Sequence, residues 1–236
     1  MAQMAGKMDE LRKIRLTGDY LSLNILERIF ANEDLTVFSE IHCNQKMYYM
    51  KSSSFENLDE KELRKEGEKL LKKINSTFSF AKENYIPVKI EDVYIGDCGY
   101  MTFEDHITLR DDLCLVENGK EKDLDEDVIL DIFAKMKNDD LLHQILTLSL
   151  EKGKDWVNLC RILELFEAHH INIVNRKWIT ETALGSLKHT ANSPGAIGNE
   201  ARHGSQSGDP PSNPMPLNRA QSLVDSVIRQ YINSLR

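Results

Sequence analysis

The hydrophobic pattern of this chain changes across the polar, acidic segment 117–127, and this change limits the possible folds to those with two different halves. Before the segment, short alternating runs that are typical of strands surround one long stretch with helical spacing. After it, the apolar runs all have the spacing of amphipathic helices. We therefore predict an α+β domain over 1–117, an acidic linker over 118–127 and an all-α helical bundle over 128–236.

The N-terminal half is predicted to contain two antiparallel β-hairpins. Residues 35–54 alternate apolar and polar side chains on both sides of Asn44-Gln45, which we interpret as the first turn. Residues 88–95 and 100–109 flank the sequence GDCG, whose glycines allow the positive φ angles of a tight turn. These patterns indicate strands that pair with their neighbours in the chain.

One long helix is expected between the two hairpins, over residues 59–82. Its apolar positions recur at helical spacing, and Asp59 can cap its first turn. Gly67 lowers helix propensity by about 1 kcal/mol relative to alanine, so we interpret it as a point of close packing on a sheet. A short strand near Lys13–Leu16, followed by at least one helical turn up to Phe30, completes the α+β domain.

The C-terminal half is predicted to be a bundle of amphipathic helices. The helical patterns cover residues 128–136, 139–150, 155–166, 180–187 and 217–235. Asp155 and Thr180 or Thr182 are suitable N-caps for the third and fourth helices. The third has a wide apolar face, which indicates a central position in the bundle.

Composition indicates a protein of the cytoplasm. Hydrophobic residues make up 41% of the chain and charged residues 29%, and no apolar run reaches the length of a membrane span. The four cysteines are scattered without a CxxC pair, and we interpret them as buried, reduced thiols. The formal net charge of −8 argues against binding nucleic acid over a broad face. No metal site or other cofactor is expected, because no His, Cys or carboxylate cluster has ligand spacing.

The connection 188–215 between the last two predicted helices contains the candidate functional site. A connection of this length without regular structure is uncommon in a compact domain and is usually functional or disordered. Among its Gly, Ser and Pro residues are five side chains that can hydrogen-bond or carry charge. These are Lys188, His189, Asn192, Arg202 and His203.

These five side chains suit metal-free chemistry on RNA. Histidines can act as general acid and base near neutral pH, so His203 and His189 are the candidate catalytic residues. Arg202 and Lys188 can bind a phosphate, and Asn192 can orient it. The RNA 2′-hydroxyl would supply the nucleophile. The same side chains equally suit plain recognition of a phosphate, or of a carboxylate on a protein partner.

A structural interpretation of the same connection remains open. Its glycines would permit tight turns, its prolines would stiffen the segment, and its His, Asn and Arg side chains would satisfy backbone groups at helix ends. In that case the protein would be a non-enzymatic adaptor or subunit that works by protein–protein interaction in a larger complex.

The C-terminal half resembles the HEPN helical domains of abortive-infection and toxin proteins. The resemblance rests on a bundle whose last two helices are joined by a loop with Asn192, Arg202 and the pair His203-Gly204. In that family an Arg four to six residues before a His forms a metal-independent ribonuclease site across a dimer interface. Arg202 and His203 are adjacent here, so the motif is not matched and its Arg would be replaced by Arg202 or Lys188.

A second resemblance concerns the segments WVNLCRILELFE, KHTANSP, EARHG and DPPSNPMPL, which are similar to a widespread, uncharacterised bacterial family over roughly residues 155–236. This second resemblance implies a bacterial origin and supports the domain boundary, and implies no function. The HEPN resemblance implies a defence- or toxin-associated protein whose C-terminal domain binds RNA or a nucleotide phosphate. The HEPN resemblance also implies cleavage of RNA and pairing of two copies through the C-terminal bundle. No membrane partner is expected.

Overall fold

The computed structural model describes six stretches of the chain and separates into two compact units. The described residues are 12–31, 34–82, 85–96, 126–152, 154–205 and 208–235. The first unit comprises Met1–Leu71 and Asn84–Glu126, and the second comprises Lys72–Glu83 and Asp127–Arg236. The long helix predicted over 59–82 therefore supplies residues to both units.

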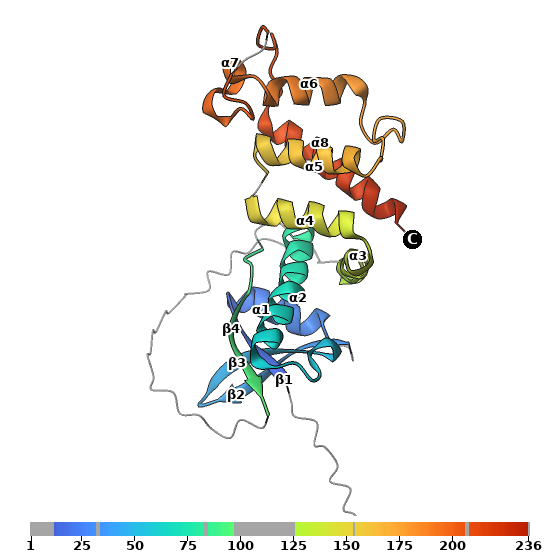
Figure 1. The fold of residues 1–236 in the computed structure, drawn as a ribbon. Coiled ribbons are helices and arrows are strands. Elements are labelled where there is room, and N and C mark those ends of the chain that lie inside the picture. The colour runs from blue at the N-terminus through green and yellow to red at the C-terminus, as the bar shows by residue number, and fades with distance from the viewer. Residues whose placement is uncertain are drawn as a thin grey trace, which may run out of the picture. The chain divides into compact units, whose positions relative to one another are not determined.

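The first unit contains a four-stranded antiparallel sheet in the strand order β2-β3-β1-β4 (Figure 1). Along the chain, its elements alternate in the order strand, helix, strand, strand, helix, strand, which is the ferredoxin-like topology. They are β1 (Arg12–Thr17), α1 (Tyr20–Ile29), β2 (Leu35–His42), β3 (Gln45–Ser52), the short 3₁₀ turn η1 (Ser53–Phe55), α2 (Glu60–Ala81) and β4 (Lys89–Ile95). The α+β prediction is confirmed, and helix α1 follows strand β1 as expected.

The hairpin of β2 and β3 turns one residue earlier than predicted. Cys43 and Asn44 form the turn with φ angles of 49° and 63°, and His42 pairs with Gln45. Two consecutive residues with positive φ match the twist of the flanking strands, and asparagine tolerates this region well. The turn at the hairpin's tip also leaves Cys43 exposed, so the prediction of a buried thiol is wrong there.

The strand predicted at 88–95 is confirmed as β4, but within the described residues it pairs with β1. Its predicted hairpin partner, 100–109, and the GDCG turn beyond Gly96 lie outside the described residues. Most of the predicted linker 118–127 lies outside them as well, and its last two residues begin helix α3 (Glu126–Asn138).

Helix α2 packs against the sheet at Gly67, as predicted. A Cβ atom at this position would lie 2.0 Å from Cδ1 of Ile14, which is fully buried on β1. The helix begins with a reciprocal pair of hydrogen bonds. The Glu62 amide donates to the Asp59 carboxylate at 2.8 Å, and the Asp59 amide donates to the Glu62 carboxylate at 3.2 Å. The expected cap is therefore confirmed.

The two helices of the first unit pack on one face of the sheet. Cross-strand neighbours Ile14, Met50 and Val37 share this face and are buried. Helix α1 contacts the same face, because the Tyr48 hydroxyl donates to the Asn24 side-chain oxygen at 2.6 Å. The side chains of alternate residues, including Lys13 and Tyr49, point to the opposite face.

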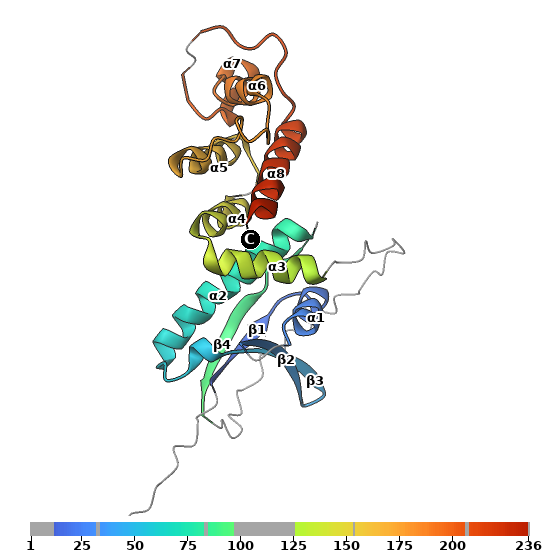
Figure 2. The ribbon, with the colours of Figure 1, turned by 90° about the vertical axis from the view of Figure 1, so that its right-hand side faces the viewer.

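The second unit is a helical bundle built around α5 (Trp156–Ala168), as predicted from the wide apolar face of this helix. Helix α5 contacts α4 (Asp140–Lys152), α6 (Glu181–Ala191) and α8 (Leu217–Ser234), an arrangement that can be followed in Figures 1 and 2. The fully buried residues of its core include Leu142, Leu159, Phe166, Leu187 and Val227. Cys160 is buried here too, as predicted.

The connection between the last two long helices is shorter than predicted and contains more regular structure. Helix α6 continues through Lys188 and His189 to Ala191, because Leu187 and Ala191 lie one turn apart and are both fully buried. A short helix α7 (Pro194–Ile197) and a 3₁₀ turn η2 (Gly198–Glu200) follow. Tertiary burial of Leu187 and Ala191 therefore supports a last turn of α6 beyond the end that the sequence predicted.

Within the described ranges, no helix is long and apolar enough to cross a membrane. In the same part of the chain, no group of three or more His, Cys, Asp or Glu side chains could hold a metal ion.

Candidate functional site

Lys188, the first residue of the predicted site, lies in the last turn of α6 and faces α5. Its ammonium group forms an ion pair with the Glu167 carboxylate near the end of α5. The side chains remain 37% and 54% exposed, respectively. This pair therefore lies at the surface. If another anion replaced the Glu167 carboxylate, neither the carboxylate nor the Lys188 ammonium would become buried.

Arg202 forms a second ion pair with the same helix. A guanidinium nitrogen lies 2.5 Å from the Glu164 carboxylate. The Arg202 backbone amide also donates to the carbonyl oxygen of Ala191 at 2.8 Å, which anchors the residue to the end of α6. The position of Arg202 is thus set by its backbone as well as by its charge.

The two ion pairs lie side by side because Glu164 and Glu167 are three residues apart on α5. Side chains at this spacing project from the same helix face, with Cβ atoms about 5–6 Å apart. We call Glu164, Glu167, Lys188 and Arg202 the charge quartet. Its members come from three chain segments, and its formal charges sum to zero.

The thiol of Cys160 lies on α5 one turn before Glu164, near the charges of the quartet. Burial raises the pKa of this thiol, while the nearby positive charges of Arg202 and Lys188 act to lower it. The structure thus brings together two of the predicted phosphate-binding residues, Lys188 and Arg202.

The other predicted residues lie around the charge quartet without joining it. His189 is exposed, and its Nε2 atom lies 3.1 Å from the carbonyl oxygen of Asp209. Asn192 caps α6, and its side-chain oxygen is buried without a hydrogen bond from any described residue. His203 is exposed, and its side chain forms no hydrogen bond or ion pair within the described ranges. No hydrogen bond or ring contact joins His189 and His203 in the described part of the chain.

Sequence reasoning missed the glutamates of the charge quartet. They occur in a helix that was interpreted only as a buried, central element. Their spacing, with Glu164 and Glu167 on one edge of the apolar face, was a possible signal. The signal is weak because the same spacing occurs on many solvated helices.

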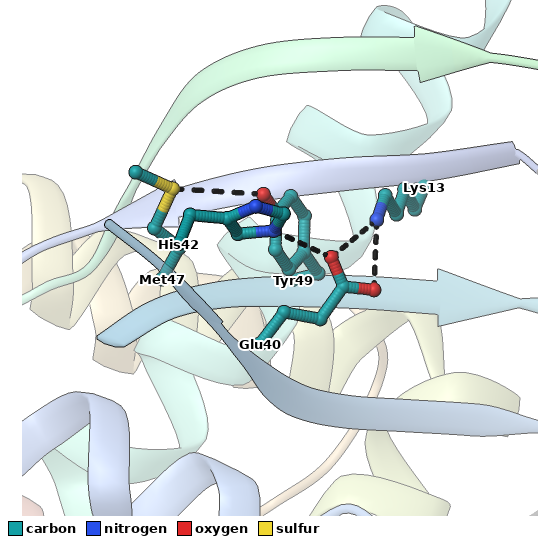
Figure 3. A network of polar contacts seen from close by, with 5 residues as sticks. All are labelled: Lys13, Glu40, His42, Met47 and Tyr49. Carbon is teal, nitrogen blue, oxygen red and sulfur yellow. Dashed lines mark hydrogen bonds and ion pairs between the residues drawn. The ribbon is translucent and has the colours of Figure 1, made fainter. Parts of the chain in front are cut away.

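A second polar cluster, also missed, lies on the sheet face opposite the helices of the first unit (Figure 3). The Lys13 ammonium lies 2.8 and 2.7 Å from the two oxygens of Glu40 and 4.0 Å from the centre of the Tyr49 ring. His42 approaches the same carboxylate at 3.0 Å. The Tyr49 hydroxyl donates to the sulfur of Met47 at 3.7 Å. The cluster joins β1, β2 and β3.

Aromatic rings surround this cluster and bury its centre. Phe38 stacks on Tyr49 with ring centroids 5.7 Å apart, and Tyr94 meets Tyr49 edge-on at 6.0 Å. Tyr49 is only 4% exposed as a result, so its ring is not open for stacking with a ligand. Burial raises the pKa of its hydroxyl. This cluster therefore stabilises the sheet, with Tyr49 at its buried centre.

The Glu40 carboxylate is expected to make the first unit sensitive to acid. Burial acts to raise its pKa, but hydrogen bonds from Lys13 and His42 and the Lys13 charge outweigh this effect, and the pKa is lowered. A carboxyl whose pKa is lowered on folding stabilises the fold above its unfolded pKa, and this stabilisation disappears as the pH falls through the folded pKa. The free energy of unfolding should therefore decrease below about pH 5.

The acid sensitivity can be measured by urea unfolding, followed by circular dichroism, at several pH values. Glu40→Gln should reduce the dependence on pH between about 5 and 3. Glu68→Gln, which removes an exposed carboxylate from α2, provides the matched control and should retain it. An unchanged dependence in Glu40→Gln would contradict the assignment.

No family model, curated protein or solved structure matches this chain.

Proposed function

We propose that the second unit binds the phosphate groups of RNA at Lys188 and Arg202. The observation that supports this proposal is the convergence of these two cations, which are 14 residues apart in the sequence, on one surface of α5. A guanidinium and an ammonium side by side match two phosphate oxygens, the first by paired hydrogen bonds and the second as a point charge. The resemblance to abortive-infection and toxin domains suggests that the setting is bacterial defence.

Binding requires only the exchange of carboxylates for phosphates. Surface ion pairs contribute about 0–1 kcal/mol, and the members of the charge quartet are all partly exposed. A phosphodiester of RNA carries one negative charge, as a carboxylate does, so it can replace Glu164 or Glu167 at little cost. The exchange leaves the buried core of α5 unchanged.

Cleavage of RNA is the catalytic form of this proposal. His203 follows Arg202 directly and is exposed, so a phosphate on Arg202 would be near an imidazole that is free to transfer a proton. His189 would serve as the second acid–base group and Asn192 would orient the phosphate. No protein nucleophile is needed, because the RNA 2′-hydroxyl gives its proton to one imidazole and attacks the adjacent phosphorus. The bond from this phosphorus to the 5′-oxygen of the next nucleotide breaks, and that oxygen takes a proton from the other imidazole.

The test is a titration of the full-length protein against a fluorescein-labelled single-stranded RNA 12-mer. Lys188→Gln/Arg202→Gln should weaken binding by about tenfold or more and reduce the slope of log affinity against log salt by about 1.5. Lys177→Gln/Arg219→Gln removes two exposed cations from elsewhere in the second unit and should change affinity by less than about threefold. Equal effects of the two double variants would refute a specific site.

Catalysis is tested separately with His203→Ala. We expect this variant to bind RNA as the wild type does but to lose cleavage of the 12-mer, and to lose growth arrest and RNA breakdown in bacteria infected with phage. Cleavage that persists in this variant would remove His203 from the mechanism. Binding without cleavage in the wild type would leave recognition as the function of the site.

A non-enzymatic adaptor is the second candidate function. It is supported by the pairing within the charge quartet, in which each cation forms an ion pair with one glutamate of α5. These ion pairs attach α6 and the connection before α8 to α5, and the quartet has no net charge. In this case the quartet would shape a surface for a protein partner or a second copy of the chain. Absence of RNA binding by the wild type and by variants of the quartet glutamates would favour this function.

A further inference from the structure

The carboxylates of Glu164 and Glu167 lie where the phosphates of a ligand would bind. Each lies against one of the two cations of the proposed site. We propose that these glutamates are intramolecular competitors, and that the ligand must carry two phosphate groups about one helical turn apart. This inference rests on the proposed function, because it concerns the same two cations.

The helix sets the spacing of the two anions that the site accepts. Glu164 and Glu167 are three residues apart on α5, which places their Cβ atoms about 5–6 Å apart. A ligand with one phosphate displaces one carboxylate and leaves the other ion pair in place. A ligand with two phosphates at similar spacing displaces both carboxylates. Its second phosphate binds while the first already holds the ligand on the protein, so the second contact forms at a high effective concentration. Successive phosphates of an RNA strand and the phosphate chain of a nucleotide both have this chemistry.

The glutamates are free to move away from the cations. Their side chains are 39% and 54% exposed, and neither carboxylate has a second hydrogen bond within the described residues. Rotation of either side chain would return its charge to water. Each carboxylate can therefore either pair with its cation or point into water, and it remains accessible to solvent in both positions. The free energy that a ligand must overcome is that of a surface ion pair.

Other contacts hold the binding residues in place once the glutamates move away. The Arg202 amide remains bound to the Ala191 carbonyl at 2.8 Å. Lys188 belongs to a regular helix. At the far end of the connection, the Met215 amide donates to the Thr190 hydroxyl at 3.0 Å. The quartet's ion pairs are therefore not required to keep the cations near each other.

The experiment compares the wild type with Glu164→Gln/Glu167→Gln, in the full chain, by titration with three probes. These are the fluorescein-labelled RNA 12-mer, ATP without magnesium, and inorganic phosphate. The double variant should bind the two-phosphate ligand about tenfold more tightly, and each single variant about threefold. Inorganic phosphate should gain less than about threefold, because it replaces one carboxylate only. Whether RNA or ATP shows the gain identifies the source of the phosphates.

The matched control is Asp127→Asn/Glu181→Gln, which makes the same change in net charge at two other exposed positions. It should alter affinity by less than about twofold. Tryptophan fluorescence unfolding would verify that each variant is folded.

The possible results separate the inference from the proposed function. The inference is supported if Glu164→Gln/Glu167→Gln binds RNA or ATP more tightly than the wild type does. Binding that is measurable for this variant and absent for the wild type supports it as well. Binding that depends on Lys188 and Arg202 but does not tighten in the glutamine variant overturns the inference and leaves the proposed function intact. Absence of binding to every probe by both proteins overturns both. A gain equal to that of the charge-matched control also overturns the inference.

Discussion

Phe166→Ala is expected to lower the free energy of unfolding of the second unit by about 3–5 kcal/mol. Phe166 is fully buried on α5. Its ring meets those of Trp178 and Tyr231 edge-on, with centroids 6.3 and 5.3 Å apart. Truncation removes this apolar surface and leaves a cavity that the surrounding helices can fill only partly. Edge-to-face aromatic pairs add about 0.5–1.5 kcal/mol beyond the burial of area.

Tryptophan fluorescence during guanidinium unfolding measures this loss directly. Both tryptophans of the chain, Trp156 and Trp178, belong to the second unit, so the signal reports on that unit. Leu165→Ala, at a half-buried position one residue earlier, is the control and should lose only about 1–2 kcal/mol. Similar losses in the two variants would contradict a core centred on Phe166.

Gly67→Val is expected to destabilise the first unit by about 2–3 kcal/mol. A Cβ atom at position 67 would lie 2.0 Å from Cδ1 of Ile14 and 3.3 Å from Cδ1 of Ile90. Ile14 is fully buried and has little space into which to move. The two additional methyl groups of valine would force α2 away from the sheet or push Ile14 out of its preferred rotamer. The gain in helix propensity over glycine, below about 1 kcal/mol, is too small to compensate.

Gly185→Val provides the control, because Gly185 also lies inside a helix but has no atom within 4 Å of its ideal Cβ position. This variant should change stability by less than about 0.5 kcal/mol. Hydrogen exchange at the amides of β1 and β3 measures the effect in the first unit, and exchange in α6 measures the control. Protection of β1 that does not change in Gly67→Val would show that the helix adapts to the larger side chain.

The candidate site could be predicted only in part. The dense group of polar residues between the last two helices identified Lys188 and Arg202, which the structure brings to one surface. Their partners, Glu164 and Glu167, were not identified. The pairing of a charged side chain depends on which helix packs opposite it, and no pattern within α5 or α6 specifies this.

Local patterns determined the elements themselves. The cap at Asp59, the close approach at Gly67 and the central position of α5 were all deduced from the order of residues, because caps, helix faces and small-residue contacts depend on neighbours within a few positions. The boundaries were less accurate. Burial of Leu187 and Ala191 extends α6 into the start of a segment whose Gly, Ser and Pro content predicted a loop.

Tertiary structure decided the remaining features. The order β2-β3-β1-β4 places β1 between β3 and β4, although neither is its neighbour in the sequence. Lys13 thereby meets Glu40 on β2, in the same way that Arg202 meets Glu164. Coulomb attraction and hydrogen bonding act over a few ångströms in space and have no fixed spacing along the chain. The pairing of strands and helices therefore had to be known before either cluster could be recognised.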